Sequence, residues 1–355
     1  MYRALSARTD ATCHVVLRSR EGADVYHDDG FGESFKWDVP LLDGYSFECC
    51  DVPRAGWRNQ IKAFGRVFVA SFSRDFDVVL VNGYRSAESL AGILAAEVRR
   101  RAWFLATDAA KAGADDYPPP LRQLARLAYR LAVRRAAGVA CMSAASEAFA
   151  LALGARLTMK RTAAINTDIF LASTHLESSP PGRLKVVAVS RMLSWKRLDL
   201  LIDAVAHVPG VSLRLVGAGP HLESLQRHAA HNENVTFVGM KMQRQLPDEY
   251  YEADVLAIAS DHEPFGVVAV EAAACGTPLV ADRSAGAAWD LIDELGAGWV
   301  VDHPADWPST LRMLRDSHVE RVEARRAAFQ AATAFYPEAV AARFVELFRQ
   351  GERRR

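Results

Sequence analysis

Short apolar runs alternate along this chain with longer segments in which apolar residues recur at helical spacing. In the first half the apolar runs cover residues 14–17, 78–81, 103–105 and 139–142, and each is followed by a polar or alanine-rich stretch. Such runs, alternating with helical patterns, are typical of parallel strands joined by crossover helices. The first half of the chain is therefore predicted to be an α/β domain.

The second half repeats this alternation more regularly. Its apolar runs are residues 185–189, 213–216, 235–238, 254–259, 278–281 and 298–301. Because a helical stretch separates each run from the next, the pattern again favours a doubly wound parallel sheet. The prediction is an α/β chain of two Rossmann-like, doubly wound domains.

A polar stretch rich in Ser and Pro separates the two halves. Residues 173–181 have the composition of an interdomain linker. We therefore predict an amino-terminal domain over residues 1–172 and a carboxy-terminal domain over residues 182–335. Residues 336–355 are predicted to form an amphipathic closing helix, which crosses back onto the first domain, followed by a basic tail.

Composition narrows the class of protein and its partners. The 355 residues exceed one domain of roughly 100 to 200 residues. Since 43 basic residues balance 43 acidic ones, no overall charge attracts nucleic acid. The five cysteines are scattered and form neither a disulfide framework nor a metal-binding pair. No apolar run approaches the roughly 18 residues of a membrane helix, and residues 1–20 lack the apolar stretch of a signal peptide. A cytoplasmic location is expected.

The segment 260–276 carries the richest chemistry. It follows a predicted buried strand and opens a helix at about Gly266, which is where α/β sheets bind ligands. Free backbone N–H groups at residues 265–267 would suit a phosphate. The carboxylates of Glu263 and Glu271 would suit sugar hydroxyls. The competing interpretation is structural: Glu263 caps the helix, and Glu271 is a solvated helix residue.

A second loop of the same domain carries two cations. Arg191 and Lys196 follow the strand predicted to end at residue 189. Two cations in a strand-to-helix loop are suited to a diphosphate, although they would also fit an ordinary charged surface loop. The turn Gly217-Ala-Gly219 is half of a dinucleotide-binding fingerprint and lacks the third glycine, so a nicotinamide cofactor is not expected.

Taken together, these motifs resemble those of the retaining glycosyltransferases of the GT-B fold, family 4. The resemblance is close from about residue 185 to residue 301, because the motifs occur in the family's order and spacing. It implies two Rossmann-like domains facing a cleft. The residues that carry it are Arg191, Lys196, Gly217, Gly219, Glu263, Pro264, Phe265, Gly266 and Glu271.

The resemblance also implies a role for each position. Arg191 and Lys196 would grip the donor diphosphate, and Glu263 would accept hydrogen bonds from the transferred sugar. Glu271 would hold the ribose hydroxyls. The other donor-side positions, near the sugar, the phosphates or the base, are Gly217, Gly219, Met240, Pro264, Phe265, Gly266 and Val267.

A mechanism consistent with these roles needs no metal and no other cofactor. Breaking the anomeric C–O bond leaves negative charge on the diphosphate, which fixed cations and helix-terminal amides stabilise. In the family the leaving phosphate is often proposed to take the acceptor proton on the same face of the sugar, which gives retention. Asp75 and Asp77 form a D-x-D pattern, but they precede a strand and so lie at the wrong edge of the sheet for a metal-dependent transferase.

The amino-terminal half resembles a subset of bacterial family 4 enzymes over residues 31–45 and 77–84. This makes four residues acceptor-side candidates. The alternative is a loop anchored by a buried Trp and a Gly turn. The candidates are Trp37, Asp38, Asp43 and Tyr45.

Two departures from the family pattern stand out. Family members usually start with a strand and a Gly-rich loop, whereas residues 1–5 here already resemble the helix after that loop, so the first strand is expected to be missing. Many members also place a His near the reacting sugar, where this chain has Thr107 and Asp108. Asp108 is a candidate for contacting the sugar or the acceptor, and it would equally serve to cap the next helix.

One segment has a distinctive charge pattern. Arginines recur every four residues with leucines between them, which predicts a basic amphipathic helix. Two interpretations remain: the helix rests on an anionic inner membrane face, where lipid-linked acceptors reside, or it is a solvated face over a packed one. The residues are Arg122, Arg126, Arg130 and Arg134, with Leu121, Leu124, Leu127 and Leu131.

The sequence therefore predicts a retaining glycosyltransferase. It would move a sugar from a UDP- or GDP-sugar to a hydroxyl acceptor in bacterial polysaccharide or glycoconjugate synthesis. The alternative is a non-catalytic GT-B protein that binds a nucleotide or a partner. The motifs specify neither the nucleotide and sugar nor the acceptor.

Overall fold

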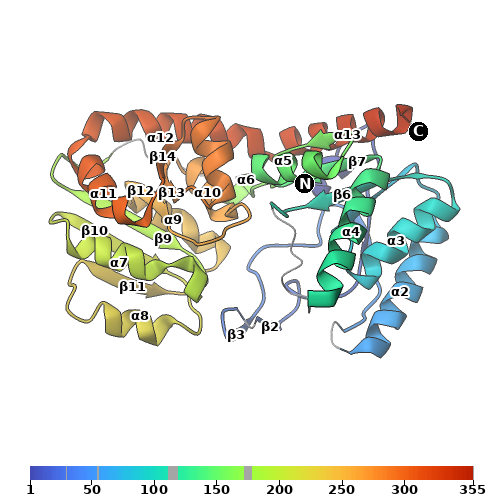
Figure 1. Cartoon of the computed structure of the whole chain (residues 1–355), viewed down its shortest axis with the longest axis horizontal. Coiled ribbons are helices and arrows are strands. Elements are labelled where there is room, and N and C mark those ends of the chain that lie inside the picture. Colours follow the sequence, from blue (N-terminus) through green and yellow to red (C-terminus); the bar gives the residue numbers. More distant parts are fainter. Residues whose placement is uncertain (29, 54–55, 111–118, 172–177, 355) are drawn as a thin grey trace. The chain divides into compact units, whose positions relative to one another are not determined.

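Two groups of parallel strands, each with its own helices, form two units in the computed structural model (Figure 1). The structure describes residues 1–28, 30–53, 56–110, 119–171 and 178–354. Unit 1 combines Met1–Asp24, Leu41–Ala164 and Pro337–Arg355. Unit 2 combines Val25–Pro40 and Ile165–Tyr336.

Unit 2 is built on a six-stranded parallel sheet with the order β11-β10-β9-β12-β13-β14. Numbered from its own first strand, this is the order 3-2-1-4-5-6 of the Rossmann fold. The order reverses between β9 and β12, so the crevice at the carboxyl ends of these two strands is the expected ligand position. The strands are β9 (Leu184–Val189), β10 (Val211–Val216), β11 (Val235–Gly239), β12 (Val255–Ile258), β13 (Leu279–Asp282) and β14 (Gly298–Val301).

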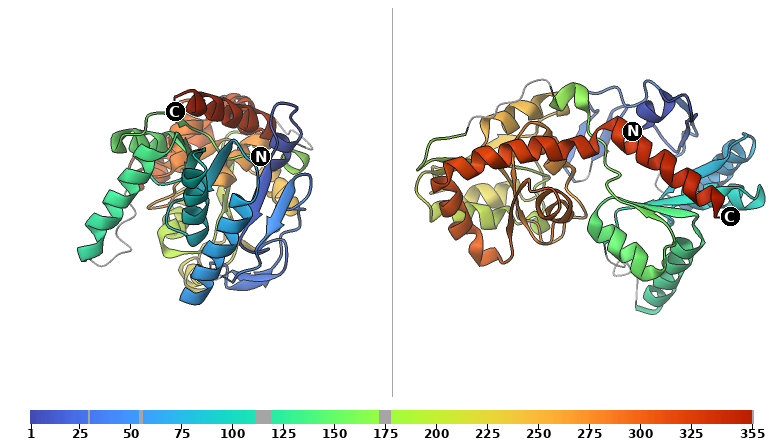
Figure 2. Two further views of the ribbon diagram at one scale, coloured as in Figure 1. Left: turned by 90° about the vertical axis from the view of Figure 1, so that its right-hand side faces the viewer. Right: turned by 90° about the horizontal axis from the view of Figure 1, so that it is seen from above.

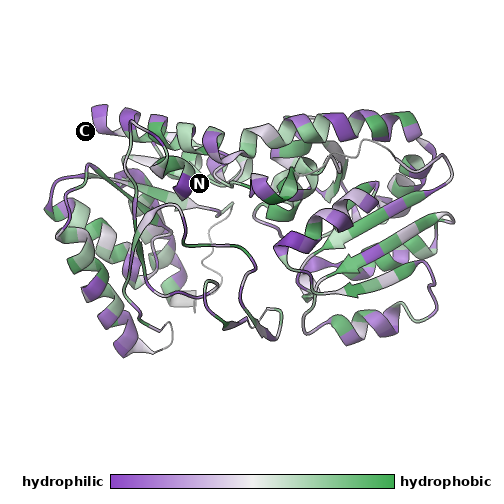
Figure 3. Ribbon diagram, turned by 180° about the vertical axis from the view of Figure 1, so that it is seen from behind, coloured by the Kyte–Doolittle hydropathy of each residue, from purple (hydrophilic) through white to green (hydrophobic). Residues whose placement is uncertain are grey.

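Helices cover both faces of this sheet, because its strands are apolar on both sides (Figure 3). Along β9, for example, Leu184 and Val186 join a buried cluster with Leu201 of α7 and Leu311 of α11. The helices are α6 (Thr167–Phe170), α7 (Leu198–Ala206), α8 (Leu222–His228), α9 (Leu246–Glu252), α10 (Val267–Ala274), α11 (Trp307–Asp316) and α12 (His318–Ala332). The short helical turns are η1 (Ser194–Lys196), η2 (Gln243–Gln245), η3 (Ala288–Asp293), η4 (Pro304–Asp306) and η5 (Thr333–Phe335).

An antiparallel hairpin from the amino-terminal part of the chain belongs to unit 2. It consists of β2 (Tyr26–Asp28) and β3 (Glu33–Phe35). Its centre is the buried ring of Phe35, which packs against the rings of Tyr26, Phe31 and Trp37. A local aromatic cluster therefore holds this short hairpin together.

Unit 1 contains two parallel sheets, β4-β1 and β5-β6-β7-β8. Among the residues that the structure describes, no ladder of hydrogen bonds joins β1 to β5. The strands are β1 (His14–Leu17), β4 (Ser46–Cys49), β5 (Val78–Asn82), β6 (Ala102–Thr107), β7 (Gly138–Cys141) and β8 (Thr158–Met159). The helices are α1 (Tyr2–Ser6), α2 (Trp57–Phe72), α3 (Ala87–Val98), α4 (Pro119–Arg135), α5 (Ala144–Leu153) and α13 (Pro337–Arg353).

Alternating residues of β6 show how these helices divide between the two faces of the sheet. Trp103 and Leu105 join a buried cluster with Val133 of α4 on one face. Phe104 on the other face packs with Leu5 of α1 and Phe344 of α13. Figure 2 shows α13 passing beside the amino terminus. The carboxy-terminal helix is therefore part of the core of unit 1.

The sequence patterns predicted these elements well. Each of the ten apolar runs coincides with or overlaps a strand, and the amphipathic closing segment forms α13. The helix predicted near residue 2 is α1. Strands β2, β3, β4 and β8 were not predicted, because they have two to four residues and little apolar patterning.

The described residues contain neither a membrane-spanning helix nor a cluster of metal-binding side chains. None of their helices is both long enough and apolar enough to span a bilayer. Nor do the described His, Cys, Asp and Glu side chains gather in a group of three or more that would hold a metal ion.

Replacing Phe344 tests the contribution of α13 to unit 1. Its side chain is 1% exposed in the cluster with Leu5 and Phe104. We expect Phe344→Ala to lower the free energy of unfolding of the chain by about 3 to 5 kcal/mol, because it leaves a cavity. The measurement is urea unfolding followed by circular dichroism. The control is Glu346→Ala on the exposed side of the same helix, expected within about 0.5 kcal/mol of the parent. Equal effects of the two variants would contradict this prediction.

Candidate functional site

The predicted donor residues lie at the point where the strand order of unit 2 reverses. Arg191 and Lys196 follow β9, and Glu263 follows β12, the strand that pairs with β9. Both loops leave the carboxyl ends of parallel neighbours, so they lie at the same edge of the sheet. The structure thus brings these three side chains to one edge from segments some 70 positions apart.

An ion pair joins the two loops. The ammonium group of Lys196 donates to a carboxylate oxygen of Glu263, and the two side chains are 14% and 16% exposed. The backbone N–H of Asp261 also donates to the carbonyl oxygen of Trp195 at 2.8 Å. Cation and carboxylate are therefore held together in a largely desolvated position, where their attraction is stronger than in water.

A glycine turn supports the loop after β9 from the side. Gly217 and Gly219 have φ angles of 136° and 148°, and a Cβ on Gly219 would lie 2.8 Å from the carbonyl oxygen of Met192. A Cβ on Gly217 would collide with the carbonyl oxygen of Ser190. These positions need glycine for both conformation and space. The N–H of Gly217 donates to the carbonyl oxygen of Gly239, which precedes Met240, so the turn also reaches the end of β11.

The loop after β12 is clamped by the loop after β13. The N–H groups of Gly286 and Ala287 donate to the carbonyl oxygens of Glu263 and Phe265 at 2.9 and 2.8 Å. The ring of Phe265 is 1% exposed and packs on Phe335, with 5.7 Å between ring centroids. This buried ring fixes the backbone that leads into α10.

Helix α10 begins immediately after this clamped loop. Gly266, with φ of 88°, is its N-cap residue, and no side chain caps the helix. The first hydrogen bond of the helix is donated by the N–H of Ala269 to Gly266. The N–H groups at the start of any helix lack helical partners, so those of Val267 and its neighbour are suited to bind an anion. The interpretation of Glu263 as the helix cap is not supported by this geometry.

Glu271 is buried in α10 rather than solvated. Its side chain accepts a hydrogen bond of 3.0 Å from the hydroxyl of Tyr250, which is fully buried in α9. Burial raises the pKa of the Glu271 carboxyl to about 7, although the bond from Tyr250 acts in the opposite direction. The competing interpretation of Glu271 as a solvated helix residue is therefore wrong. No residue near Glu271 in the chain indicates Tyr250 as its partner, because Tyr250 belongs to another helix.

Arg191 is exposed, and the hairpin flanks its side chain. Gly30 approaches the guanidinium so closely that a Cβ at this position would collide with it. The segment after the hairpin contacts Arg244 of η2: the backbone N–H of Arg244 donates to the Asp38 carboxylate at 3.1 Å, and its Nε donates to the Asp38 carbonyl oxygen at 3.2 Å. The hairpin and the residues that follow it therefore contact two segments of unit 2, the loop after β9 and η2.

The four acceptor-side candidates are divided between the units. Trp37 and Asp38 belong to unit 2, and Asp43 and Tyr45 to unit 1. Trp37 packs edge-on against Phe35, with 5.2 Å between ring centroids. The hydroxyl of Tyr45 donates to the carbonyl oxygen of Leu41 at 2.8 Å. The two pairs of candidates therefore belong to different units.

Asp108 follows β6 in unit 1 and is exposed. Its neighbour Thr107 shares a hydrogen bond of 2.9 Å with the hydroxyl of Tyr129. Whether Asp108 caps a helix is not answered, because residues 111–118 lie outside the described residues. Asp75 and Asp77 precede β5, and they form ion pairs with Arg99 and Arg101.

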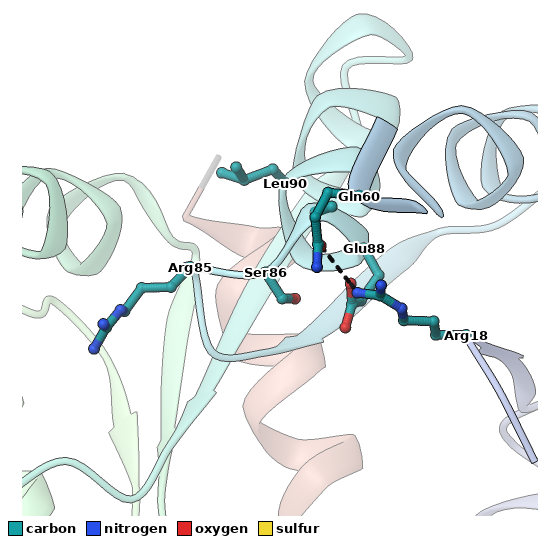
Figure 4. Close-up of a pocket in the computed structure, with 7 residues that line it drawn as sticks. Arg18, Gln60, Arg85, Ser86, Glu88 and Leu90 are labelled. Atoms are coloured by element: carbon teal, nitrogen blue, oxygen red, sulfur yellow. Dashed lines mark hydrogen bonds and ion pairs between the residues drawn. The ribbon is translucent and has the colours of Figure 1, made fainter. Parts of the chain in front are cut away.

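A pocket in unit 1 was not predicted from the sequence (Figure 4). It has a volume of about 560 Å³ and lies where α3 begins after β5. The guanidinium of Arg18 donates to Gln60 at 3.0 Å and to Glu88 at 3.2 Å. The available signal was the position of Arg85 in the short loop between β5 and α3. The lining residues are Arg18, Gln60, Arg85, Ser86, Ala87, Glu88 and Leu90.

Comparison with known proteins identifies a matching family model and several relatives. Residues 176–327 match the family model described as "Glycosyl transferases group 1". The GDP-mannose-dependent alpha-(1-6)-phosphatidylinositol monomannoside mannosyltransferase of Mycolicibacterium smegmatis is 40% identical over 131 residues, covering 33% of this chain and 34% of that protein. The D-inositol 3-phosphate glycosyltransferase of the same organism is 35% identical over 147 residues, covering 38% of this chain and 34% of that protein. The chain thus aligns with about a third of the length of these curated relatives.

A solved structure resembles the chain over nearly its whole length. Sucrose-phosphate synthase from Thermosynechococcus elongatus has a TM-score of 0.70 and 20% identity, covering 98% of this chain and 91% of that one. Identity at this level is evidence for the fold alone. The predicted GT-B fold, an α/β fold with two parallel-sheet units, is confirmed.

The raised pKa of the buried Glu271 carboxyl predicts how the stability of the fold depends on pH. Its pKa is about 7 in the folded chain, against 4.5 for an ordinary Glu, so folding favours the protonated form. The contribution of this group to stability is present below pH 4.5 and is lost as the pH rises to about 7, by about 3 kcal/mol in total. We therefore expect Glu271→Gln to gain in stability relative to the parent between pH 5 and pH 8.

The measurement is the urea unfolding midpoint of both proteins at the two pH values. Glu223→Gln, an exposed residue of α8, is the control for losing a carboxylate. A difference between Glu271→Gln and the parent that is the same at pH 5 and pH 8 would contradict the assignment.

Proposed function

Over residues 176–327 the chain belongs to the glycosyl transferases group 1 family, and from this premise we propose that it is a retaining, family 4 glycosyltransferase. The donor is a UDP- or GDP-sugar, and the acceptor carries a hydroxyl group. The observation that supports this most strongly is the convergence of Arg191, Lys196 and Glu263 at the reversal point of a Rossmann-ordered sheet.

In the proposed mechanism, the donor diphosphate replaces the carboxylate of Glu263 as the partner of Lys196. Without donor, Lys196 and Glu263 satisfy each other. When a diphosphate enters, the ammonium group turns to a phosphate oxygen, and Glu263 becomes available for the sugar hydroxyls. Because one anion replaces another, Lys196 is never left as an isolated buried charge, which would be costly.

Negative charge on the departing diphosphate is stabilised by fixed groups. Arg191 and Lys196 supply cations, and the first turn of α10 supplies N–H groups at Val267 and its neighbour. These groups are held by backbone contacts at Gly219 and Gly286, so they need little rearrangement as charge develops. In this proposal Glu271 accepts hydrogen bonds from the ribose hydroxyls, and Met240 contacts the nucleotide base.

The acceptor binds to unit 1 in this proposal. The pocket at the start of α3 offers the guanidinium groups of Arg18 and Arg85, and Asp108 lies at the end of another strand of the same sheet. Trp37, Asp38, Asp43 and Tyr45 remain candidates. The mycobacterial relative is named for a phosphatidylinositol monomannoside, which supports a lipid-linked acceptor. The protein would then work at the cytoplasmic face of a membrane, in polysaccharide or glycoconjugate synthesis.

The Glu263 carboxylate is expected to contribute to kcat rather than to the affinity for the nucleotide. We predict that Glu263→Ala lowers kcat about tenfold or more, equivalent to about 1.4 kcal/mol, because the sugar loses its acceptor of hydrogen bonds. Affinity for UDP or GDP is expected to be unchanged or higher, because Lys196 loses its competing partner. Glu271→Ala should weaken the nucleotide itself.

Calorimetry with both nucleotides, followed by transfer and hydrolysis assays with their sugars, provides these measurements. Asp261→Ala removes an exposed carboxylate from the same loop and is the control. Reversed effects of Glu263→Ala and Glu271→Ala would reverse the assignment. Nucleotide binding without turnover on any acceptor would favour the non-catalytic alternative.

The two cations are expected to bind the diphosphate. Arg191→Ala and Lys196→Ala should each weaken nucleotide binding by roughly ten- to 150-fold, since a charge-assisted hydrogen bond contributes about 1.5 to 3 kcal/mol. Lys196→Ala should have the larger effect, because it also leaves the Glu263 carboxylate facing the phosphates. The double variant Lys196→Ala/Glu263→Ala should therefore bind the nucleotide more tightly than Lys196→Ala.

Calorimetric titration with UDP and GDP of the parent, Lys196→Ala, Glu263→Ala and the double variant completes this double-mutant cycle. Lys185→Ala, an exposed residue within β9, is the control for losing a lysine. Unchanged affinity in both single variants would remove Arg191 and Lys196 from the site. Additive effects in the double variant would contradict the proposed exchange of partners.

A further inference from the structure

The turn of the β2–β3 hairpin packs against the side chain of Arg191. A Cβ added at Gly30 would lie 2.7 Å from Cδ and 3.1 Å from Cζ of Arg191, and it would collide with Nη1. The φ angle of Gly30 lies outside the left-handed region, so its backbone conformation does not require glycine. The missing side chain therefore matters for space, because it lets the turn touch the guanidinium.

Hydrogen bonds to one residue fix the shape of this turn. The Asp28 carboxylate accepts the N–H groups of Gly30 and Phe31 at 2.8 and 3.1 Å, and the Asp28 carbonyl oxygen accepts the N–H of Gly32 at 2.8 Å. The hydroxyl of Tyr26 donates to the second carboxylate oxygen at 3.2 Å. These N–H groups are therefore engaged within the hairpin, and Gly30 meets Arg191 as part of a defined turn.

A second contact holds this part of the chain to unit 2. The buried ring of Phe35 keeps the hairpin together. Asp38, which follows the hairpin, accepts the two hydrogen bonds from Arg244 described above. One of them comes from the backbone N–H of Arg244, so it does not depend on the conformation of a side chain. The turn at Gly30 is thus attached to unit 2 independently of Arg191.

The two cations of the proposed donor site are positioned in different ways. Lys196 is only 14% exposed and is held by its ion pair with Glu263. Arg191 is exposed, and a long exposed side chain loses rotamer freedom when it binds a ligand. A fixed surface beside the guanidinium lowers that loss, because fewer orientations are open to Arg191 before the ligand arrives.

We propose that the hairpin turn positions Arg191 for the donor diphosphate. Gly30 limits the orientations of the guanidinium, and Asp28 holds the turn that carries Gly30. Both are positioning residues, which act through Arg191 and do not themselves contact the nucleotide. The inference rests on the proposed function, since it takes Arg191 as a ligand of the diphosphate. It gives this hairpin from the amino-terminal part of the chain a role on the donor side.

The first test is a double-mutant cycle between Gly30 and Arg191. We expect Gly30→Ala to weaken UDP and GDP binding about three- to tenfold, because the added methyl group displaces the guanidinium. In the Arg191→Ala background the same change should have no further effect, because no guanidinium remains to be displaced. The measurement is calorimetric titration of the parent, both single variants and the double variant. Gly65→Ala is the control, since Gly65 is exposed in α2 and a Cβ there meets nothing within 4 Å.

Substitution of Asp28 tests the turn independently of Gly30. Asp28→Ala should weaken nucleotide binding by a similar factor, because two backbone N–H groups lose their acceptor. Asp28→Asn should retain most of the affinity, since its amide oxygen still accepts both. Glu33→Ala removes an exposed carboxylate directly opposite Asp28 in the hairpin and should bind like the parent. Urea unfolding midpoints equal to that of the parent identify variants that retain the fold.

The outcomes separate this inference from the proposed function. If Arg191→Ala weakens binding but Gly30→Ala does not, or weakens it equally in both backgrounds, the inference is overturned and the proposed function stands. Tighter binding by Gly30→Ala would also overturn it, because the hairpin would then compete with the diphosphate for Arg191. An effect of Asp28→Asn as large as that of Asp28→Ala would overturn the role of Asp28. Unchanged affinity in Arg191→Ala would contradict the proposed function at this residue, and the inference with it.

Discussion

Close backbone contact between loops is the constraint on which the site in unit 2 depends. Lys196 and Glu263 meet because their loops leave adjacent strands, but strand adjacency alone leaves loops free to diverge. Gly219 lets one turn approach the backbone of Met192, and Gly286 lets another approach Pro264. Added Cβ atoms would separate these segments. The ion pair is thus a consequence of four backbone segments held together at one edge of the sheet, and the N–H groups at the start of α10 are directed by the same contacts.

The elements that position the site could be predicted from the sequence, because apolar periodicity and strand-to-helix loops are local signals. Ten strands were identified in this way, and the loops that carry Arg191 and Glu263 follow two of them. Contacts between distant segments could not be predicted. Nothing near Glu271 indicates Tyr250, and nothing near Arg191 indicates Gly30 of the hairpin. These pairings depend on which helices and loops lie side by side, which a single sequence does not encode locally. The roles of the site residues remain predictions.

The aromatic anchoring of the hairpin could be predicted from its own residues, but the unit to which the hairpin belongs could not. Its aromatic residues form a cluster around Phe35, so the loop is anchored much as the structural interpretation of its Trp suggested. Its neighbours, however, are Arg191 and Arg244 of unit 2. The resemblance over residues 31–45 had made Trp37, Asp38, Asp43 and Tyr45 acceptor-side candidates together. The chain passes from unit 2 to unit 1 within these residues, so neighbours in sequence belong to different units, and composition carries no signal for that crossing.

The two units differ in how they use apolar surface. In unit 2 the six strands lie between helices whose apolar sides are mostly buried, and polar groups gather at one edge. In unit 1, α2, α3 and α4 each have a buried apolar side and a second apolar side in solvent. A helix that is apolar on two sides exposes apolar surface to water unless another surface covers it, and such exposed surface favours aggregation. The arginines and lysines among these residues oppose self-association through electrostatic repulsion. The charge on these helices therefore counteracts the aggregation that their exposed apolar side chains favour.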